Sequence, residues 1–477
     1  MSYGNWEPVI GLEIHAQLNT KTKMFSSDPA EFGSGDNENV SPVSLGMPGA
    51  LPVFSEKGLE YSIKIGHALN CKIKRKSVFS RKNYFYPDLP KGYQISQYDE
   101  PLCENGYLDI YLDGGKKRVG ITRAHMEEDA GKSTHHGDYS LLNFNRAGVP
   151  LMEIVSEPDI KSPAEAAEYA RTVRNILRYL EVCDGNLEEG SLRCDCNVSV
   201  RRVGESRLGT KVEIKNVNSF RFVEKAIDYE IKRQIAALES GEKIVQETRL
   251  YDATKNRTFT MRTKEDAHDY RYFPEPDLLP VVFEEVWLNK IKASLPELPI
   301  QRALRFQNEY GLPEYDALVL TQEKATADYF ELVAKDCGNP KAASNWIMVE
   351  LMRELKETDL SIENQPIKAK SLSALIQLID KGTISGKMAK SVFVDMWKSG
   401  DDAEKIIKSK GLVQISDDSA IEKIVDDVLI KNPGPVQDYR SGKDKLFGFF
   451  VGQVMKASKG QANPEAVNRI LLKKLKE

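Results

Sequence analysis

The sequence has no long hydrophobic run, and none of its segments approaches the roughly 18–20 consecutive apolar residues of a membrane-spanning helix. Its N-terminus has neither the basic start and apolar stretch of a secretion signal nor the arginine- and serine-rich character of a transit peptide. We therefore expect a cytoplasmic protein without a membrane partner. With 41% hydrophobic and 29% charged residues over 477 positions, the composition is typical of a globular protein of several domains.

Cysteine is also scarce, with six residues in the whole chain. Only Cys194 and Cys196 lie close together, and no second pair completes the four ligands of a tetrahedral zinc site. This usage argues for reduced thiols rather than a disulfide framework. Alternation along a strand places both residues on the face of Val198 and Val200, which favours small side chains of the core.

The common nucleotide-binding motifs are missing as well. A Gly-x-Gly-x-x-Gly fingerprint is absent, which argues against a nicotinamide or flavin enzyme. The run Gly131-Lys132-Ser133-Thr134 resembles the end of a P-loop, but Met126 stands where that motif requires its first glycine. Any nucleotide site must therefore be built in another way.

The pattern of residues predicts an α+β protein of three domains. A mixed α/β domain is expected at residues 1–295, an all-helical domain at 296–400 and a small helical tail at 401–477, with boundaries at the Leu-Pro-Glu-Leu-Pro run at 295–299 and near Ser-Gly-Asp at 399–401. Helices are expected after Ser162, which opens a capping box, and after Ser219. Strands are expected at residues 9–18, 108–112, 118–126, 151–155, 191–201 and 210–216.

Three of these strands have a polar face that contains an acid. Alternation places Glu13 beside His15 in the first strand and Arg193 beside Asp195 in another, and in the last it groups Lys211, Glu213 and Lys215. Carboxylates with an imidazole suit a hard dication such as Mg²⁺, and neighbouring Arg and Lys suit phosphate oxygens. The alternative, the solvated side of an ordinary antiparallel sheet, remains open at this point.

Further acids extend this pattern. The run His-Met-Glu-Glu-Asp at 125–129, which contains Glu128, ends a strand with a density of charge that would repel itself without a cation. Glu153 lies in the apolar run Leu-Met-Glu-Ile-Val, where a carboxylate needs a partner. A metal ion and an arginine are equally consistent with it.

Two segments interleave cations with aromatic residues, at 81–94 and at 269–277. Such a composition can stack unpaired bases and hold phosphates, as recognition of an RNA end requires. It can equally form rigid aromatic–proline turns, and both interpretations stay open.

Charge is unevenly distributed along the chain. The net charge is −4, yet residues 440–477 contain nine Lys and Arg against three acids, so this segment is basic and the remainder acidic. A basic tail suits contact with a polyanion at one end of the protein. An ordinary helix with solvated lysines would give the same pattern.

Several long motifs together resemble one family, the B subunit of the aspartyl/glutamyl-tRNA amidotransferase. The motifs span nearly the whole chain in the family's order: VIGLEIH at 9–15, RKNYFYPD at 81–88, HMEEDAGKS at 125–133, EIVSEPD at 153–159, GSLRCD at 190–195, DYRYFPEPD at 269–277 and GQVMKASKGQANP at 452–464.

The resemblance implies a glutamine synthetase-like cradle domain, a helical domain and a tail that contacts tRNA. It implies a heterotrimer with an amidase A subunit, which releases ammonia from glutamine, and a small C subunit. The complex would act as a carbon–nitrogen ligase that converts misacylated Glu-tRNA(Gln) or Asp-tRNA(Asn) to the amide with ATP. Some members of the family have a cysteine pair in the N-terminal loop, but residues 41–44 read Ser-Pro-Val-Ser here, so we expect no zinc.

The resemblance also implies a set of catalytic metal ligands, Glu13, His15, Glu128, Glu153 and Asp195. We hypothesise that His15, Glu128 and Glu153 hold one Mg²⁺ and that Glu13 and Asp195 hold a second. Arg193, Lys211 and Lys215 would bind phosphate oxygens of ATP, and the expected tRNA contacts in the tail are Lys456, Lys459, Arg469 and Lys473. The alternatives are a free-standing ATP-dependent ligase for a small acid and a non-catalytic RNA-binding scaffold.

Overall fold

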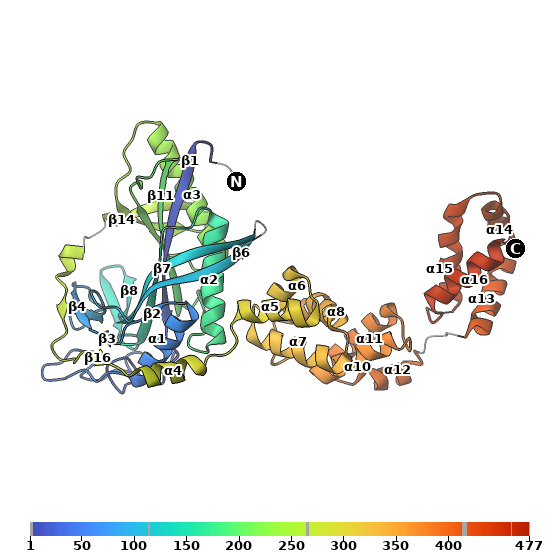
Figure 1. The fold of residues 1–477 in the computed structure, drawn as a ribbon, viewed down its shortest axis with the longest axis horizontal. Helices are drawn as coiled ribbons and strands as arrows, with labels where there is room; N and C mark the ends of the chain where they lie inside the picture. The colour runs from blue at the N-terminus through green and yellow to red at the C-terminus, as the bar shows by residue number, and fades with distance from the viewer. Residues whose placement is uncertain (1–2, 113–114, 264–266, 413–416, 459, 477) are drawn as a thin grey trace. The chain divides into compact units, whose positions relative to one another are not determined.

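The protein, described here by a computed structural model, forms two compact units. The structure describes residues 3–112, 115–263, 267–412, 417–458 and 460–476. The first unit, Met1–Leu298, contains a large sheet with helices, and the second, Pro299–Glu477, is helical (Figure 1). The predicted α+β class is confirmed at this level.

A nine-stranded sheet organises the first unit. Its strands follow the order β14-β13-β12-β11-β1-β10-β7-β6-β2, and neighbours run antiparallel except for the parallel pair β12–β13. The bounds are β1 Trp6–Gln17, β2 Lys72–Ile73, β6 Cys103–Leu112, β7 Gly115–Glu128, β10 Pro150–Ser156, β11 Leu192–Arg202, β12 Val212–Lys215, β13 Glu247–Asp252 and β14 Arg257–Thr263. Strands far apart in sequence thus become neighbours at the centre, where β11, β1, β10 and β7 lie side by side.

Two long helices cover one face of this sheet (Figure 1). They are α2 (Pro163–Tyr179) and α3 (Phe220–Glu239), and their predicted N-caps are confirmed, since Ser162 Oγ accepts from the Glu165 amide and Ser219 Oγ from the Phe222 amide, both at 3.2 Å. The strand residues on this side form the core. On β1 and β11 they include Leu12, Ile14, Cys194, Cys196 and Val198, all at most 3% exposed, so the core assignment of the two cysteines is confirmed.

Shorter elements complete the first unit. A three-stranded sheet, β15-β4-β5, joins the two aromatic segments of the sequence, because Phe273 of β15 pairs with Arg81 of β4. The remaining elements are β3 Lys76–Ser77, β4 Ser80–Asn83, β5 Tyr93–Ser96, β8 Lys132–His136, β9 Tyr139–Asn143, β15 Phe273–Pro274, β16 Val281–Val282, α1 Glu56–Ala68, α4 Glu285–Ala293 and the 3₁₀ helix η1 Ala267–Tyr270.

The second unit contains two separate hydrophobic cores. One is built by α5 Pro299–Tyr310, α6 Glu314–Leu320, α7 Lys324–Cys337, α8 Pro340–Asn345, the π-helix η2 Trp346–Leu351, α9 Met352–Thr358, α10 Ala369–Asp380, α11 Gly386–Ser399 and α12 Ala403–Lys410. The other is built by α13 Asp418–Lys431, α14 Pro433–Arg440, η3 Asp444–Leu446, α15 Phe447–Ala457 and α16 Pro464–Lys476. Helix α12 buries Ala403, Ile406 and Ile407 in the first of these cores, although the sequence analysis placed a boundary at 400.

Among the helices that the structure describes, none combines the length and the apolar character that crossing a lipid bilayer would require.

Candidate metal and nucleotide site

The polar residues of the central strands meet in rows on the face of the sheet opposite α2 and α3. His125 of β7, Glu153 of β10, His15 of β1 and Arg193 of β11 are successive partners in the strand register. Directly opposite residues share a face of the sheet, so these side chains emerge on the same side. In the next row Glu13 lies opposite Asp195. Four strands from distant parts of the chain therefore place their polar side chains together.

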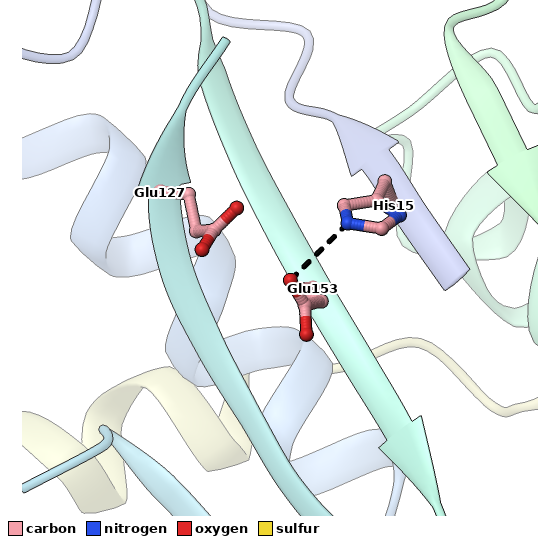
Figure 2. A group of neighbouring side chains, drawn as sticks. All are labelled: His15, Glu127 and Glu153. Carbon is pink, nitrogen blue, oxygen red and sulfur yellow. Dashed lines mark hydrogen bonds and ion pairs between the residues drawn. The ribbon is translucent and has the colours of Figure 1, made fainter. Parts of the chain in front are cut away.

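Three of these side chains come close enough to share one ion. Ligand atoms of His15, Glu127 and Glu153 all lie within 4.8 Å of one another, and each residue comes from a different strand (Figure 2). His15 Nε2 is 3.1 Å from Glu153 Oε2, and the side chains of Glu127 and Glu153 are 4% and 10% exposed. Two buried carboxylates beside an imidazole form a donor set that suits a hard dication.

Electrostatics keep both carboxylates ionised. Burial alone would raise the pKa of Glu153, but His125 and the hydrogen bond from His15 lower it well below its usual range. Burial and the neighbouring Glu153 would likewise raise the pKa of Glu127, yet Lys82 and His125 lower it overall. The His15 pKa, which burial would lower, is instead raised by Glu153. The cluster thus holds two negative charges at neutral pH.

A pocket of about 500 Å³ opens over this cluster. The sheet contributes the acids to its lining, and segments 82–98 and 270–272 contribute an aromatic side. The tyrosines contact one another there: Tyr84 and Tyr270 lie edge to face at 6.1 Å, and the rings of Tyr98 and Tyr272 stack at 4.1 Å. The cations that line the pocket are Lys82, Arg123, Lys211 and Lys215.

The two aromatic segments are held rigidly against each other. Arg81 donates two hydrogen bonds to Glu275, from Nε at 2.6 Å and from Nη2 at 2.7 Å, and the Glu275 side chain is fully buried. Asn83 donates to the carbonyl of Arg271 at 2.9 Å. The segments therefore form the rigid aromatic framework that one interpretation predicts, and they also present tyrosines to the pocket. Base stacking by these tyrosines stays a prediction.

Comparison with known proteins agrees with this architecture. Residues 8–289 match the family model of the GatB/GatE catalytic domain, and residues 328–475 match that of the GatB domain. Similar relatives are named as the B subunit of an aspartyl/glutamyl-tRNA(Asn/Gln) amidotransferase. The protein from Bdellovibrio bacteriovorus is 66% identical over the full length of both chains, and that from Thermodesulfovibrio yellowstonii is 59% identical over 99% of this chain and 100% of the relative.

The chain belongs to the family of amidotransferase B subunits. A third relative, from Geotalea daltonii, is 57% identical over 98% of this chain and 99% of its own. The match thus covers the sheet unit, with its acidic pocket, and most of the helical unit.

Six of the eight predicted metal and phosphate ligands of this family member line the same pocket, namely Glu13, His15, Glu153, Asp195, Lys211 and Lys215. Within it, Lys215 forms an ion pair with Asp195, and Asn197 donates to Glu13 at 2.8 Å. Burial would lower the pKa of Lys215, but Asp195 and Glu213 raise it, so this amine stays protonated.

Two predicted residues lie elsewhere. Glu128 forms an ion pair with Lys91 and accepts from the Ile95 amide at 2.9 Å, and it lines a separate pocket of about 160 Å³. Arg193 donates to Asp129 at 2.7 Å and is not among the residues that line the larger pocket. The cause for Glu128 is strand alternation, because it shares a face of β7 with Met126 and not with His125.

The residue that joins His15 and Glu153 is instead Glu127, which the sequence analysis did not single out. Extending the alternation rule to the end of β7 identifies it, since residues 123, 125 and 127 share a face. His125 and Arg123, on the same face of β7, were missed in the same way, and Lys82 was missed as well. Lys82 is the least accessible to sequence reasoning, because it comes from β4 of the separate three-stranded sheet.

The basic residues of the tail differ in their surroundings. Lys456 of α15 and Lys473 of α16 are exposed, whereas Arg469 donates twice to Asp418, at 2.6 and 2.8 Å. Lys459 lies outside the described residues.

Proposed function

We propose that this chain is the tRNA-dependent subunit of a glutamine-hydrolysing amidotransferase. It would convert misacylated Glu-tRNA(Gln), Asp-tRNA(Asn) or both to the amide in the cytoplasm, at the expense of ATP. The observation that carries the proposal is the convergence of His15, Glu127 and Glu153 within 4.8 Å in a pocket also lined by four cations. Such a pocket suits a nucleotide and its metal ion.

The donor set fits Mg²⁺. Two ionised carboxylates and an imidazole are available, and oxygen ligands with one imidazole suit a hard dication. We place His15, Glu127 and Glu153 in the first ligand set and Glu13 with Asp195 in the second, and we leave Glu128 out. When bound, the ion would neutralise charge on the phosphates of ATP. No zinc is part of the proposal.

The chemistry explains why ATP is needed. A carboxylate resists attack by ammonia because an oxide ion is a very poor leaving group. An oxygen of the side-chain carboxylate therefore attacks the γ-phosphorus of ATP, which gives an acyl phosphate and ADP. Ammonia then displaces phosphate from the acyl phosphate to form the amide. Phosphoryl transfer depends mainly on positioning and charge neutralisation. Lys82, Lys211 and Lys215 line the pocket and would hold phosphate oxygens of ATP. Arg193 donates a hydrogen bond to Asp129 and would position that acid.

Partner subunits would supply the ammonia that the reaction consumes. We propose that an amidase A subunit provides ammonia from glutamine and that a small C subunit completes the heterotrimer. The sheet unit would be the glutamine synthetase-like cradle, and the tail would contact tRNA through Lys456, Lys459, Arg469 and Lys473. Exposure of Lys456 and Lys473 supports this role for two of them.

The test is an amidation assay with the copurified complex, supplied with Glu-tRNA or Asp-tRNA. We expect product only when ATP, Mg²⁺ and charged tRNA are all present, and we expect chelation of the metal to stop amidation while glutamine hydrolysis continues. Amidation of a free acid without RNA would favour a small-molecule ligase. RNA binding without any Mg²⁺-dependent ATP turnover would favour a scaffold, and either result would overturn the proposal.

A further inference from the structure

One end of the pocket contains a flat aromatic stack. The rings of Tyr98, which follows β5, and Tyr272, which precedes β15, lie 4.1 Å apart with planes only 3° from parallel. Aromatic pairs in proteins more often meet edge to face or tilted, as Tyr270 does against Tyr272 at 6.0 Å and 71°. Tyr98 remains 39% exposed although Tyr272 covers one of its faces. The stack is therefore open to a third flat ring.

Both tyrosines of the stack line the pocket that contains the acids and the four cations. Burial raises the pKa of Tyr272 to about 12, so this phenol remains neutral at physiological pH. The Tyr84–Tyr270 contact at 6.1 Å adds a second edge-to-face contact behind the stack. The stacked pair is thus held in place before any ligand arrives, which lowers the conformational entropy that a ligand would lose on binding.

Arg123 is a cation of the same pocket, and it has no anionic partner among the residues that the structure describes. It lies on β7, on the face shared with His125 and Glu127, and its buried Nε has no hydrogen-bond partner within the described part of the chain. No ion pair of Arg123 is seen among those residues either, whereas Lys215 in the same pocket is paired with Asp195. A half-buried guanidinium without a partner is suited to a phosphate, which it can grip with two parallel hydrogen bonds.

We infer that Tyr98, Tyr272 and Arg123 form a subsite for an adenosine nucleotide, in which the base stacks on Tyr98 and Arg123 holds a phosphate. The inference rests on the proposed function, which brings two such groups to the pocket, ATP and the 3′-terminal adenosine of the tRNA. Base–aromatic stacking contributes about 1–3 kcal/mol per base, so the stack would govern affinity rather than the chemical step.

The test uses the assembled complex and separates the two sources. The KM for ATP is measured at saturating charged tRNA, and the KM for charged tRNA at saturating ATP, for the double variant Tyr98→Ala/Tyr272→Ala and for Arg123→Ala. We expect one of the two KM values to rise about tenfold, with a smaller change in kcat. The double variant Tyr98→Phe/Tyr272→Phe keeps both ring faces and should restore the wild-type value. Tyr139→Ala, on the β9 strand and outside the pocket lining, is the matched control and should change neither KM.

A rise confined to ATP identifies the nucleotide co-substrate as the occupant, and a rise confined to tRNA identifies its 3′ end. Wild-type KM values for both substrates in folded alanine variants would overturn the inference. If the alanine variants do not fold, photocrosslinking of the unmodified complex decides. It uses 8-azido-ATP and tRNA ending in 8-azidoadenosine, and labelling only outside the peptides with Tyr98 and Tyr272 would overturn the inference. Failure of the proposed function is distinct, because the unmodified complex would then show no ATP-dependent amidation.

Discussion

Two buried acids, Glu350 in the helical unit and Glu153 in the sheet unit, have different partners. In the helical unit the Glu350 side chain is 5% exposed, and its oxygens lie 2.8 Å from Arg353 Nη1 and 2.7 Å from Lys390 Nζ. In the sheet unit Glu153 is 10% exposed, and its ion-pair partners in the described part of the chain are imidazoles, His15 at 3.1 Å and His125 at 3.9 Å. Similar burial is therefore met by permanent cations around Glu350 and by titratable rings around Glu153.

The difference is the one expected if Glu350 is a structural acid and Glu153 is a metal ligand, as we propose. A buried carboxylate beside two permanent cations is neutralised by the fold itself. Glu153 shares its surroundings with a second carboxylate, Glu127, so the pocket keeps negative charge that an added cation can neutralise. Uncompensated negative charge of this kind is what the proposed metal site predicts.

The largest expected effect comes from Glu153→Gln. We expect ATP-dependent amidation by the complex to fall about 100-fold or more, because a metal ligand is lost, while glutamine hydrolysis continues. Without metal, thermal unfolding should change little, because the substitution also removes repulsion from Glu127. Amidation at the wild-type rate in this variant would contradict the proposed role of Glu153 as a metal ligand.

Glu350→Gln should show the opposite profile. Removing the charge weakens two ion pairs, so we expect the free energy of unfolding to fall by about 1–2 kcal/mol, a moderate value because Arg353 and Lys390 can remain solvated. Amidation measured well below the melting temperature should be unchanged. Lost activity in a folded Glu350→Gln complex would contradict the structural role.

The smallest effect is expected in the tail. The double variant Lys456→Ala/Lys473→Ala should raise the KM for charged tRNA a few-fold and reduce the slope of log affinity against log salt by about two, one for each lost phosphate contact. Lys474→Ala is the control and should leave the salt slope unchanged, because the Lys474 amine already forms ion pairs with Glu422 at 2.8 Å and Asp426 at 3.0 Å. An unchanged salt slope in the double variant would exclude these two lysines from the RNA interface.

Local patterns in the sequence predicted more than long-range ones. Alternation has a period of two residues, so the polar faces with Glu13, His15 and Asp195 were readable within single strands. The order of the strands was not, because it depends on which distant segments pair. Glu128 shows the limit of motif resemblance, since two adjacent glutamates in one motif can exchange roles, whereas alternation along β7 favours Glu127.

Local sequence patterns could not predict the partner of Arg193 or the residue at which the first helical core ends. Asp129 lies in another strand region, and only the assembled sheet brings the two together. Gly400 was interpreted as part of a boundary, yet it is the left-handed cap of α11, with φ of 69°. Such a cap ends a helix and gives no information on whether the next helix joins the same core, as α12 does.

Binding of Mg²⁺ or Mn²⁺ to the folded protein, measured by calorimetry and by thermal unfolding across a metal titration, tests the central claim most directly. We expect the wild-type chain and Glu128→Gln to bind the ion and to gain about 2.7 kcal/mol of stability when the free ion is at a hundredfold of its Kd. Glu127→Gln should lose both effects. Binding that survives Glu127→Gln and disappears in Glu128→Gln would contradict the account.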